Sequence, residues 1–183
     1  MKIIGTPLEG LFEIQTLATS DARGRFSRLF CEQDFKPIRA DLHFTQINVS
    51  DTTQSGTIRG MHFQTPPTAE AKLIRCLRGR VFDVAVDVRQ DSPTFLKWHA
   101  LELNAENNRA VFIPEGFAHG FQSLCDDVQL LYMHTAAWSG ENERGLRFDD
   151  RRLAIRWPLP VSVVSEKDAT LELIESGFTG IRL

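Results

Sequence analysis

The sequence predicts an all-β domain: a β-sandwich or barrel of the jelly-roll kind, with only short peripheral helices. The first observation behind this prediction is that roughly eight to ten short, β-like runs recur along the chain. The second is that Asn, Asp, Gly and Pro separate these runs, as the chemistry of tight turns requires. Because no linker and no internal repeat divides the 183 residues, we expect a single domain over residues 1–183.

The expected strands follow one another closely, each bounded by turn residues. They cover residues 11–17, 42–49, 57–64, 72–77, 81–88, 95–103, 109–113, 119–124 and 128–135. We predict two hairpins among them. Gly79 turns the strand at 72–77 into the strand at 81–88, and Asp126 and Asp127 turn 119–124 into 128–135.

A helix signal appears only near the end of the chain. Ser165 and Asp168 are spaced as a capping box, which predicts a short helix from there to about Ile174, ending near Gly177. Barrels of the predicted kind can enclose a cavity for a small ligand at one mouth.

Composition and charge exclude several classes of protein. The 21 Lys and Arg and 24 Asp and Glu residues give a net charge of −3, which predicts no binding to nucleic acid or to an anionic membrane. No apolar run approaches the ~20 residues of a membrane span. The apolar run at the start of the sequence is too short for the core of a secretory signal. Cys31, Cys76 and Cys125 fit no metal or redox spacing, so we expect reduced thiols in a cytoplasmic protein.

Familiar catalytic motifs are missing. The chain has no phosphate-binding P-loop, no GxGxxG, no GxSxG and no HExxH. Nucleotide hydrolysis, NAD chemistry and serine hydrolysis therefore lack support.

Polar residues interrupt the strand expected at 57–64. Arg59, His62 and Gln64 do not fit a plain hydrophobic strand. By strand alternation His62 and Gln64 share a face, and Arg59 points the other way unless Gly60 forms a bulge. His62 alone has an ordinary interpretation as a structural histidine, but its polar neighbours favour a functional one.

A second polar cluster surrounds His119. Pro114 and Gly116 make a tight turn, and His119 begins the next strand, where it can project into a barrel mouth. The spacing Pro-x-Gly-x-x-His resembles the second motif of the cupin superfamily of jelly-roll barrels. Many cupins bind a metal through this His together with a His-x-His and a Glu. Here only His62 stands in the first-motif region, and a transition metal needs three or four ligands, so we predict no metal.

Three further features each have an ordinary and a functional interpretation. Lys72 begins an apolar strand, where a lysine commonly protects a sheet edge. Tyr132 is either a core aromatic or a functional hydroxyl, and it is the single tyrosine beside 13 Phe. The segment Arg23–Phe26 has, by composition, the character of a turn with solvated charges.

Taken together, several segments resemble the dTDP-4-dehydrorhamnose 3,5-epimerase family, from about residue 5 to residue 175. The segments, in the family's order, are Asp21–Phe26, Gln46–Asn48, Gly56–Gln64, Lys72, Asp83–Arg89, Ser92–Thr94, Pro114–Phe121, Tyr132, Trp157–Pro158 and Ser165–Asp168. The resemblance implies a cupin-fold homodimer that needs neither metal nor cofactor. Its implied reaction is epimerisation at C3, at C5 or at both carbons of a nucleotide-linked 4-keto-6-deoxyhexose, of the type that converts dTDP-4-dehydro-6-deoxyglucose to dTDP-4-dehydrorhamnose.

The resemblance also implies roles for individual residues. A C4 ketone acidifies the hydrogens on C3 and C5, so a base can form an enolate and an acid can return a proton to the opposite face. His62 matches the family's base, Asp168 the carboxylate that orients it, and Tyr132 the acid. Lys72 matches a cation near the keto oxygen, where enolate charge develops.

The resemblance further implies a set of substrate-binding residues. They are Arg23, Phe26, Gln46, Asn48, Arg59 and His119. Arginines suit a diphosphate because the guanidinium fork binds oxyanions through two hydrogen bonds. In the family the segment at 23–26 comes from the partner subunit, which makes the active site shared.

Two residues depart from the family pattern. The family often has Glu two residues after its first-motif Phe, where this chain has Arg28, and an aromatic hydroxyl six residues after the catalytic Tyr, where this chain has Trp138. Both bear on substrate choice and on whether C3, C5 or both carbons react.

Three alternatives to the two-carbon epimerase stay open. A ketoisomerase or single-site epimerase on a related nucleotide sugar need not keep an acid opposite the base. A non-catalytic sugar-binding cupin has no need of Asp168 behind His62. A metal-dependent cupin is the third, and a metal assay on the purified protein distinguishes it.

Overall fold

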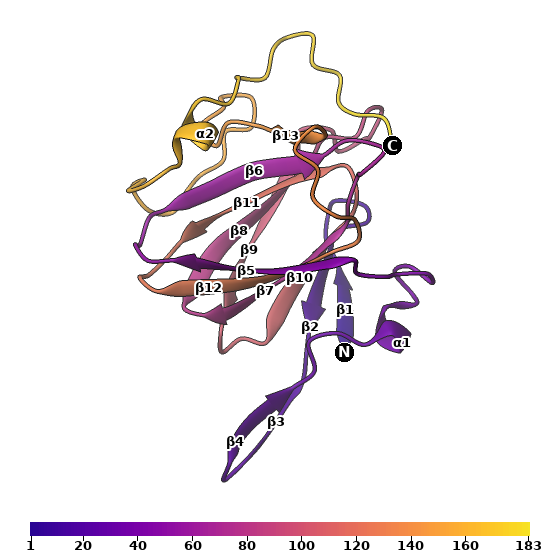
Figure 1. Cartoon of the computed structure of the whole chain (residues 1–183), viewed down its shortest axis with the longest axis vertical. Helices are drawn as coiled ribbons and strands as arrows, with labels where there is room; N and C mark the ends of the chain where they lie inside the picture. Colours follow the sequence, from indigo (N-terminus) through magenta and orange to yellow (C-terminus); the bar gives the residue numbers. More distant parts are fainter.

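The computed structural model describes all of residues 1–183 and consists of two facing antiparallel sheets (Figure 1). The first sheet has six strands in the order β1 (Lys2–Gly5), β2 (Phe12–Gln15), β10 (Arg109–Ile113), β7 (Lys72–Arg78), β12 (Val128–His134) and β5 (Gln46–Thr52). The second has five, in the order β13 (Glu143–Gly145), β6 (Ile58–Gln64), β11 (Phe117–Ser123), β8 (Arg80–Asp87) and β9 (Trp98–Asn104). The predicted all-β, jelly-roll class is confirmed.

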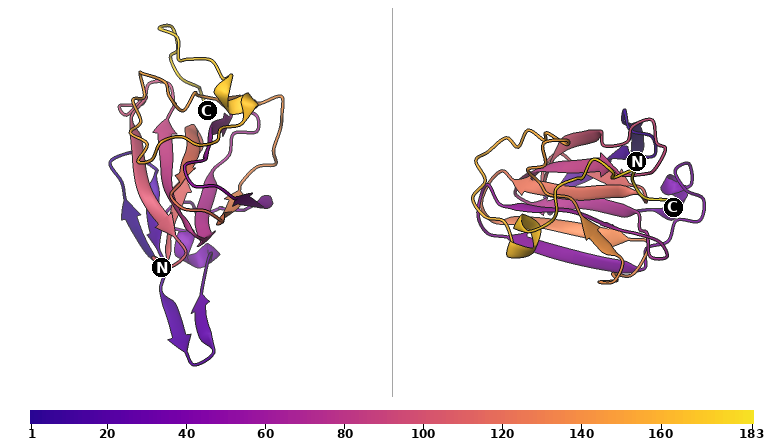
Figure 2. Two further views of the ribbon diagram at one scale, coloured as in Figure 1. Left: turned by 90° about the vertical axis from the view of Figure 1, so that its left-hand side faces the viewer. Right: turned by 90° about the horizontal axis from the view of Figure 1, so that it is seen from above.

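Three smaller elements complete the fold. A two-stranded hairpin of β3 (Ala18–Asp21) and β4 (Gly24–Ser27) projects from the sandwich (Figure 1 and the left panel of Figure 2). The helices are single turns, α1 (Glu32–Phe35) and α2 (Glu166–Ala169). The helix predicted to reach Ile174 is therefore wrong in length: the Ser165 cap forms, but the chain leaves the helix at Thr170.

Both predicted hairpins are wrong in their pairing. β7 lies in the six-stranded sheet and β8 in the five-stranded one, so the turn at Gly79 carries the chain from one sheet to the other. The turn at Asp126 and Asp127 does the same between β11 and β12. The residues of a tight turn are similar whether the turn closes a hairpin within one sheet or connects the two sheets of a sandwich.

Apolar side chains form three layers around the two sheets. The central layer, which includes Ile74, Leu103, Phe121 and Leu130, lies between the sheets. A second layer on the outer face of the five-stranded sheet packs under the chain after Leu146. The third layer, on the outer face of the six-stranded sheet, packs under the chain around α1.

The inward faces of the strands change character along their length. On β12, Val128 and Leu130 lie in the central core, and the next two inward residues are Tyr132 and His134. On β7, which runs antiparallel to β12, the buried Ile74 is preceded on the inward face by Lys72. One end of the sandwich is therefore a dry core and the other is lined by polar groups.

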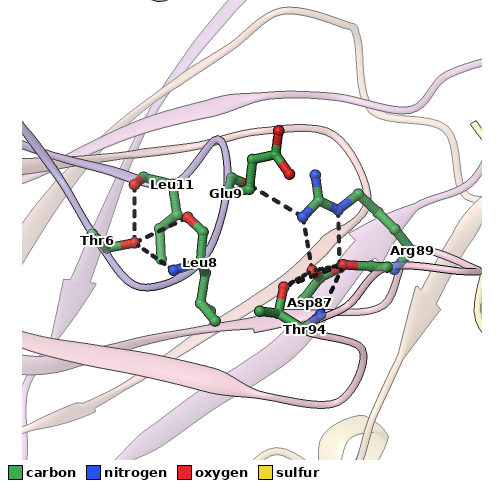
Figure 3. Close-up of polar contacts among 8 residues, drawn as sticks. Thr6, Leu8, Glu9, Leu11, Asp87, Arg89 and Thr94 are labelled. Atoms are coloured by element: carbon green, nitrogen blue, oxygen red, sulfur yellow. Dashed lines mark hydrogen bonds and ion pairs between the residues drawn. The ribbon is translucent and has the colours of Figure 1, made fainter.

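The loop at the end of β8 is held by a buried carboxylate, Asp87 (Figure 3). Its oxygens accept hydrogen bonds from the guanidinium of Arg89 (2.9 and 2.7 Å) and from the hydroxyls of Ser92 and Thr94 (2.6 Å each). Arg89 also donates to the Glu9 carbonyl, which joins this turn to the N-terminal loop. The network fixes the loop after β8 to the chain that enters β2.

Two smaller findings bear on the predictions above. None of the helices has the length and hydropathy that crossing a membrane requires. Cys31, Cys76 and Cys125 are all free thiols.

Candidate active site

The polar end of the sandwich holds a cavity of about 530 Å³ between the two sheets. Eight of the residues that the sequence singled out line it: Asn48, Arg59, His62, Lys72, His119, Tyr132, Trp138 and Asp168. They come from β5, β6, β7, β11, β12, the loop after β12 and the C-terminal segment, so only the assembled sandwich brings them together.

A bulge in β6 places Arg59 and His62 on the same face. His119 of β11 pairs with His62, whereas Phe121 pairs with Arg59, so three residue steps on β6 oppose two on β11. Gly60 sits in the bulge with φ near 115°, and a Cβ there would lie 2.5 Å from the Gly120 Cα. The sequence predicts that Arg59 shares a face with His62 only if Gly60 forms a bulge. Gly60 does form one, so the two side chains lie on the same face.

His62 forms a close pair with Asp168. Its Nε2 lies 2.8 Å from Asp168 Oδ1, and the second carboxylate oxygen accepts the Gly60 N–H at 3.0 Å. Burial raises the pKa of Asp168, but the hydrogen bonds from His62 and Gly60 outweigh it and hold the pKa below its usual value. An ionised carboxylate accepts the Nε2 proton, which leaves Nδ1 with the lone pair of a base.

The C-terminal segment delivers Asp168 to this position. Ser165 caps the single turn of α2 by accepting the Asp168 N–H at 3.1 Å. Just before it, Val164 forms a parallel bridge to Ile58 of β6. The bridge and the cap hold the carboxylate against the strand that carries His62.

Tyr132 stands on the opposite wall, on β12. Its Oη lies 3.2 Å from Ser50 Oγ on the neighbouring strand β5. The rings of His119 and His134 flank it, one edge-on and one stacked, each with its centroid 6.1 Å away. Burial raises the pKa of the Tyr132 hydroxyl well above its usual value, so the group holds its proton at neutral pH.

Lys72 is 6% exposed and is not the sheet-edge lysine of the ordinary interpretation. It lies on β7, which has neighbours on both sides, and its Nζ donates to the His62 carbonyl at 3.2 Å. The Glu70 carboxylate lies 3.2 Å from the same ammonium. The cation is thereby fixed between the two walls.

The cavity contains further paired groups. His119 Nε2 lies 2.9 Å from the buried Asp83 carboxylate. Arg59 donates to Thr52 Oγ1 and to the Asp51 carbonyl, which leaves part of its guanidinium fork facing the cavity. These contacts fix the orientation of the His119 ring and the Arg59 guanidinium along the cavity.

Gln64 and Trp138 belong to the cavity rim. Gln64 is buried, and its side chain accepts the Ser139 N–H at 2.6 Å and donates to the Ala137 carbonyl, so it positions the loop after β12. This loop presents Trp138, whose side chain is 63% exposed. Gln46 lies outside the cavity lining and accepts the Trp138 backbone N–H at 3.0 Å.

Three predicted residues lie away from the cavity of their own chain. Arg23 and Phe26 are on the projecting hairpin, where the Arg23 side chain is 90% exposed and Phe26 is 76% exposed. Arg28 follows the hairpin and faces Asp34 at 3.5 Å.

Sequence reasoning missed five residues that line the cavity: Ser50, Glu70, His134, Glu143 and Lys167. Glu70 bridges Lys72 and the Nδ1 of His134, the latter at 2.8 Å, and Lys167 pairs with Glu143 at 2.6 Å. Lys167 lay within the recognised Ser165–Asp168 segment. The remaining four stood in no motif, and strand parity linked only Ser50 to Asn48 and His134 to Tyr132.

The geometry supports proton transfer more directly than metal binding. No group of three or more His, Cys, Asp or Glu side chains in the structure converges as a set of metal ligands. Instead a carboxylate-oriented imidazole and a protonated phenol face one cavity from opposite sheets, with a fixed ammonium beside them. Such an arrangement suits removal of a proton next to a carbonyl and its return to the other face.

Comparison with protein families gives one match over nearly the whole chain. Residues 5–176 match the family model described as dTDP-4-dehydrorhamnose 3,5-epimerase. Among curated relatives, the dTDP-4-dehydrorhamnose 3,5-epimerase of Sinorhizobium fredii is 48% identical over 151 residues, which is 82% of this chain and 77% of the relative.

Solved structures agree. The epimerase of Legionella pneumophila, in complex with dTDP-4-keto-L-rhamnose, superimposes with a TM-score of 0.90 at 36% identity, covering 100% of this chain and 98% of that one. A 3'-monoepimerase from Streptomyces bikiniensis, in complex with dTDP-quinovose, has a TM-score of 0.87 at 32% identity and covers 93% and 86% of the two chains.

Proposed function

This chain belongs to the dTDP-4-dehydrorhamnose 3,5-epimerase family, and on that premise we propose that it inverts C3 and C5 of a dTDP-linked 4-keto-6-deoxyhexose. The observation that carries the proposal is the His62–Asp168 pair facing Tyr132 across one cavity. The natural substrate is then of the dTDP-4-dehydro-6-deoxyglucose type, and the product of the dTDP-4-dehydrorhamnose type.

His62 acts as the base in this proposal. Its Nδ1 takes the hydrogen from the carbon next to the ketone, and the imidazolium that forms is stabilised by Asp168 at 2.8 Å. Because the carboxylate is already ionised, it supports the charged ring without taking the proton itself. The same base serves C3 and C5, since both carbons flank the C4 ketone.

Lys72 stabilises the enolate. Negative charge develops on the keto oxygen as the proton leaves, and an ammonium that is fixed in advance lowers the energy of that state. Its contacts with the His62 carbonyl and Glu70 hold Nζ on the cavity wall between the base and the acid. The cation takes the place that a metal ion fills in other enolising enzymes.

Tyr132 returns the proton from the opposite side. Its raised pKa keeps the phenol protonated until the enolate, a stronger base, forms beside it. Because His62 and Tyr132 lie on different sheets, the returned proton arrives on the other face of the sugar ring. The configuration at that carbon is then inverted.

Arg59 and Asn48 line the cavity as donors for the substrate, and His119, whose Nε2 is paired with Asp83, adds a further polar ring to the lining. Lys72 and Lys167 are paired with Glu70 and Glu143, so Arg59 is the cation of the cavity that is left for a diphosphate, which supports a further contribution from a second subunit. The hairpin that carries Arg23 and Phe26 extends away from its own sandwich (Figure 2, left). Both side chains are exposed. We therefore propose a homodimer in which each hairpin completes the partner's site.

Epimerisation at a single carbon is the second candidate. Two observations favour a single-carbon reaction. The chain is similar to a 3'-monoepimerase, and Trp138 lies on the cavity rim at the position where the family often has an aromatic hydroxyl. In either case the enzyme is an isomerase, and the same base and acid carry the reaction.

Incubation of the enzyme with dTDP-4-dehydro-6-deoxyglucose in heavy water tests the proposal. We expect NMR to show deuterium at both C3 and C5, together with inverted product. Deuterium at one carbon alone assigns the single-site reaction, and a product whose ketone has moved from C4 to C3 assigns ketoisomerase chemistry. If neither carbon exchanges while the nucleotide sugar binds, the chain is a binding protein and the proposal fails.

A further inference from the structure

We propose that Ser50 is a positioning residue for the proton donor: its hydroxyl donates a hydrogen bond to Tyr132 Oη and thereby directs the phenolic proton into the cavity. The inference rests on the proposed role of Tyr132 as the acid. It assigns a part in the reaction to a residue that no motif in the sequence identified.

The two hydroxyls meet because of the strand register. On β5 and β12, Ser50 pairs with Leu130, and Asn48 pairs with Tyr132, so Ser50 and Tyr132 are diagonal neighbours on the inward face. Their oxygens lie 3.2 Å apart. Ser50 Oγ is the only protein group that hydrogen-bonds the phenol, and Tyr132 is likewise the only side chain bonded to Ser50 Oγ.

The direction of this hydrogen bond follows from what each group must do. If Tyr132 donated to Ser50, the phenolic proton would point at the strand and away from the sugar. If Ser50 donates, its proton has Tyr132 Oη as acceptor, and the phenolic O–H is free to face the cavity. The rings of His119 and His134, which flank Tyr132, hold the phenol ring in this orientation.

The same bond stabilises the state that follows proton transfer. The Tyr132 O–H bond breaks, a C–H bond forms at the enolate carbon, and the electron pair of the broken bond stays on the phenolate oxygen. Ser50 then donates to a charged acceptor, which makes a stronger hydrogen bond than a neutral one. Proton exchange with water returns the phenolate to the phenol and the His62 imidazolium to the imidazole before the next turnover.

Electrostatics supports this assignment. Burial raises the pKa of Tyr132, and the hydrogen bond from Ser50 is the largest influence that lowers it. Charged Asp83 and Arg59 act more weakly and in opposite directions. Removal of the Ser50 hydroxyl therefore makes the phenolate harder to form.

The first arm of the test measures that ionisation directly. Tyr132 is the single tyrosine of the chain, so growth on 3,5-difluorotyrosine labels this position alone. The fluorines lower the pKa of the phenol into the pH range in which the protein is folded. Absorbance then measures the fraction of phenol that is ionised. In Ser50→Ala we expect the ionisation midpoint to move to higher pH, and in Ser50→Thr, which keeps the hydroxyl, we expect it to stay near wild type.

The second arm measures turnover of the unlabelled enzymes. A hydrogen bond to a charged group predicts that Ser50→Ala lowers kcat for inverted product about ten- to a hundredfold, with KM little changed and with Ser50→Thr restoring most of the rate. An unmoved midpoint in Ser50→Ala overturns the inference, as does a raised KM with an unchanged kcat. The substitution Tyr132→Phe removes the acid itself, so full activity in that variant would instead contradict the proposed function.

Discussion

At the scale of single residues, the account depends on a division of labour between His62 and Tyr132. Tyr132→Phe keeps the ring between His119 and His134 and removes only the hydroxyl. We expect a stability loss of about 0.5–1.5 kcal/mol, the usual contribution of one hydrogen bond. Inverted product should fall by roughly 10²–10⁴-fold, while His62 still washes solvent deuterium into the substrate from its own face.

The measurement for Tyr132→Phe compares exchange with product formation in heavy water. A parallel fall of both rates would show that Tyr132 assists deprotonation or binding. If neither rate falls, another group supplies the proton. Trp138 is not that group, because an indole N–H is a donor only and far too weak an acid.

Asp168 provides a second test at the same scale. Asp168→Asn removes the ionised acceptor of the Nε2 proton, and its amide can donate an N–H that favours the tautomer with a protonated Nδ1. We expect the variant to lose much of the roughly 10²–10⁴-fold contribution of a positioned base, measured as deuterium exchange. The matched control is Asp149→Asn, which removes an exposed carboxylate paired with Arg147. Equal rates in the two variants would make Asp168 purely structural.

At the scale of elements, the turn after β8 depends on Asp87. Five donor groups converge on this buried carboxylate, and their hydrogen bonds outweigh burial and hold its pKa below the usual value (Figure 3). A carboxyl whose pKa is lower in the folded state stabilises the fold above its ordinary pKa and loses that contribution as pH falls through the lowered value. The stabilisation by Asp87 is therefore complete at neutral pH and disappears in acid.

We expect Asp87→Asn to lower the free energy of unfolding by roughly 1.5–3 kcal/mol at pH 7, the range for hydrogen bonds to a charged group. The difference from wild type should shrink as pH falls below about 4, where the carboxyl begins to be protonated in the unfolded chain, and it should vanish below the lowered pKa of the folded state. Urea unfolding at several pH values measures both effects. The control is Asp91→Asn in the same loop, where the side chain is exposed. A difference that is constant with pH would contradict the electrostatic origin.

Elements also explain where prediction from sequence succeeds and fails. The strand at 109–113 was predicted with its observed bounds, because alternation and flanking turns are local properties. The partners of strands are not local, so the turn at Gly79 was predicted to close a hairpin that the fold does not contain. Motif residues such as His62 were identified because they break a local pattern.

Residues that obey the local pattern were missed. Ser50 is an unremarkable serine in a polar strand, and its meeting with Tyr132 depends on the register between β5 and β12. Glu70 and His134 are 64 positions apart, and only the pairing of β7 with β12 brings them to 2.8 Å. The roles assigned to Arg23 and Phe26 stay predictions, since they depend on a second subunit.

At the scale of the whole molecule, the proposed sharing of the active site between two subunits makes a prediction about mixed dimers. His62→Ala leaves a sound hairpin but removes the base, and a double variant, Arg23→Ala with Phe26→Ala, removes the hairpin contacts but keeps the base. Each protein alone should be nearly inactive. In a mixed dimer, one site combines His62 of the second chain with the intact hairpin of the first, so activity should return.

Mixing the two proteins under conditions that exchange subunits, followed by an epimerisation assay, checks this prediction. The control mixes His62→Ala with Asp168→Asn, which affect the same wall of the same chain and should not complement each other. If the hairpin mixture also stays inactive although mixed dimers form, the hairpin serves its own chain or has no part in the site.

The central claim is that one base, His62, removes the proton from both carbons. The most direct measurement is deuterium incorporation at C3 and C5 in His62→Ala, with substrate binding measured by calorimetry on the same protein. The account predicts that exchange disappears at both carbons together, while the nucleotide sugar still binds through Arg59 and its neighbours. Exchange that persists at either carbon at a near-normal rate would contradict it, because a second base would then have to act in the cavity.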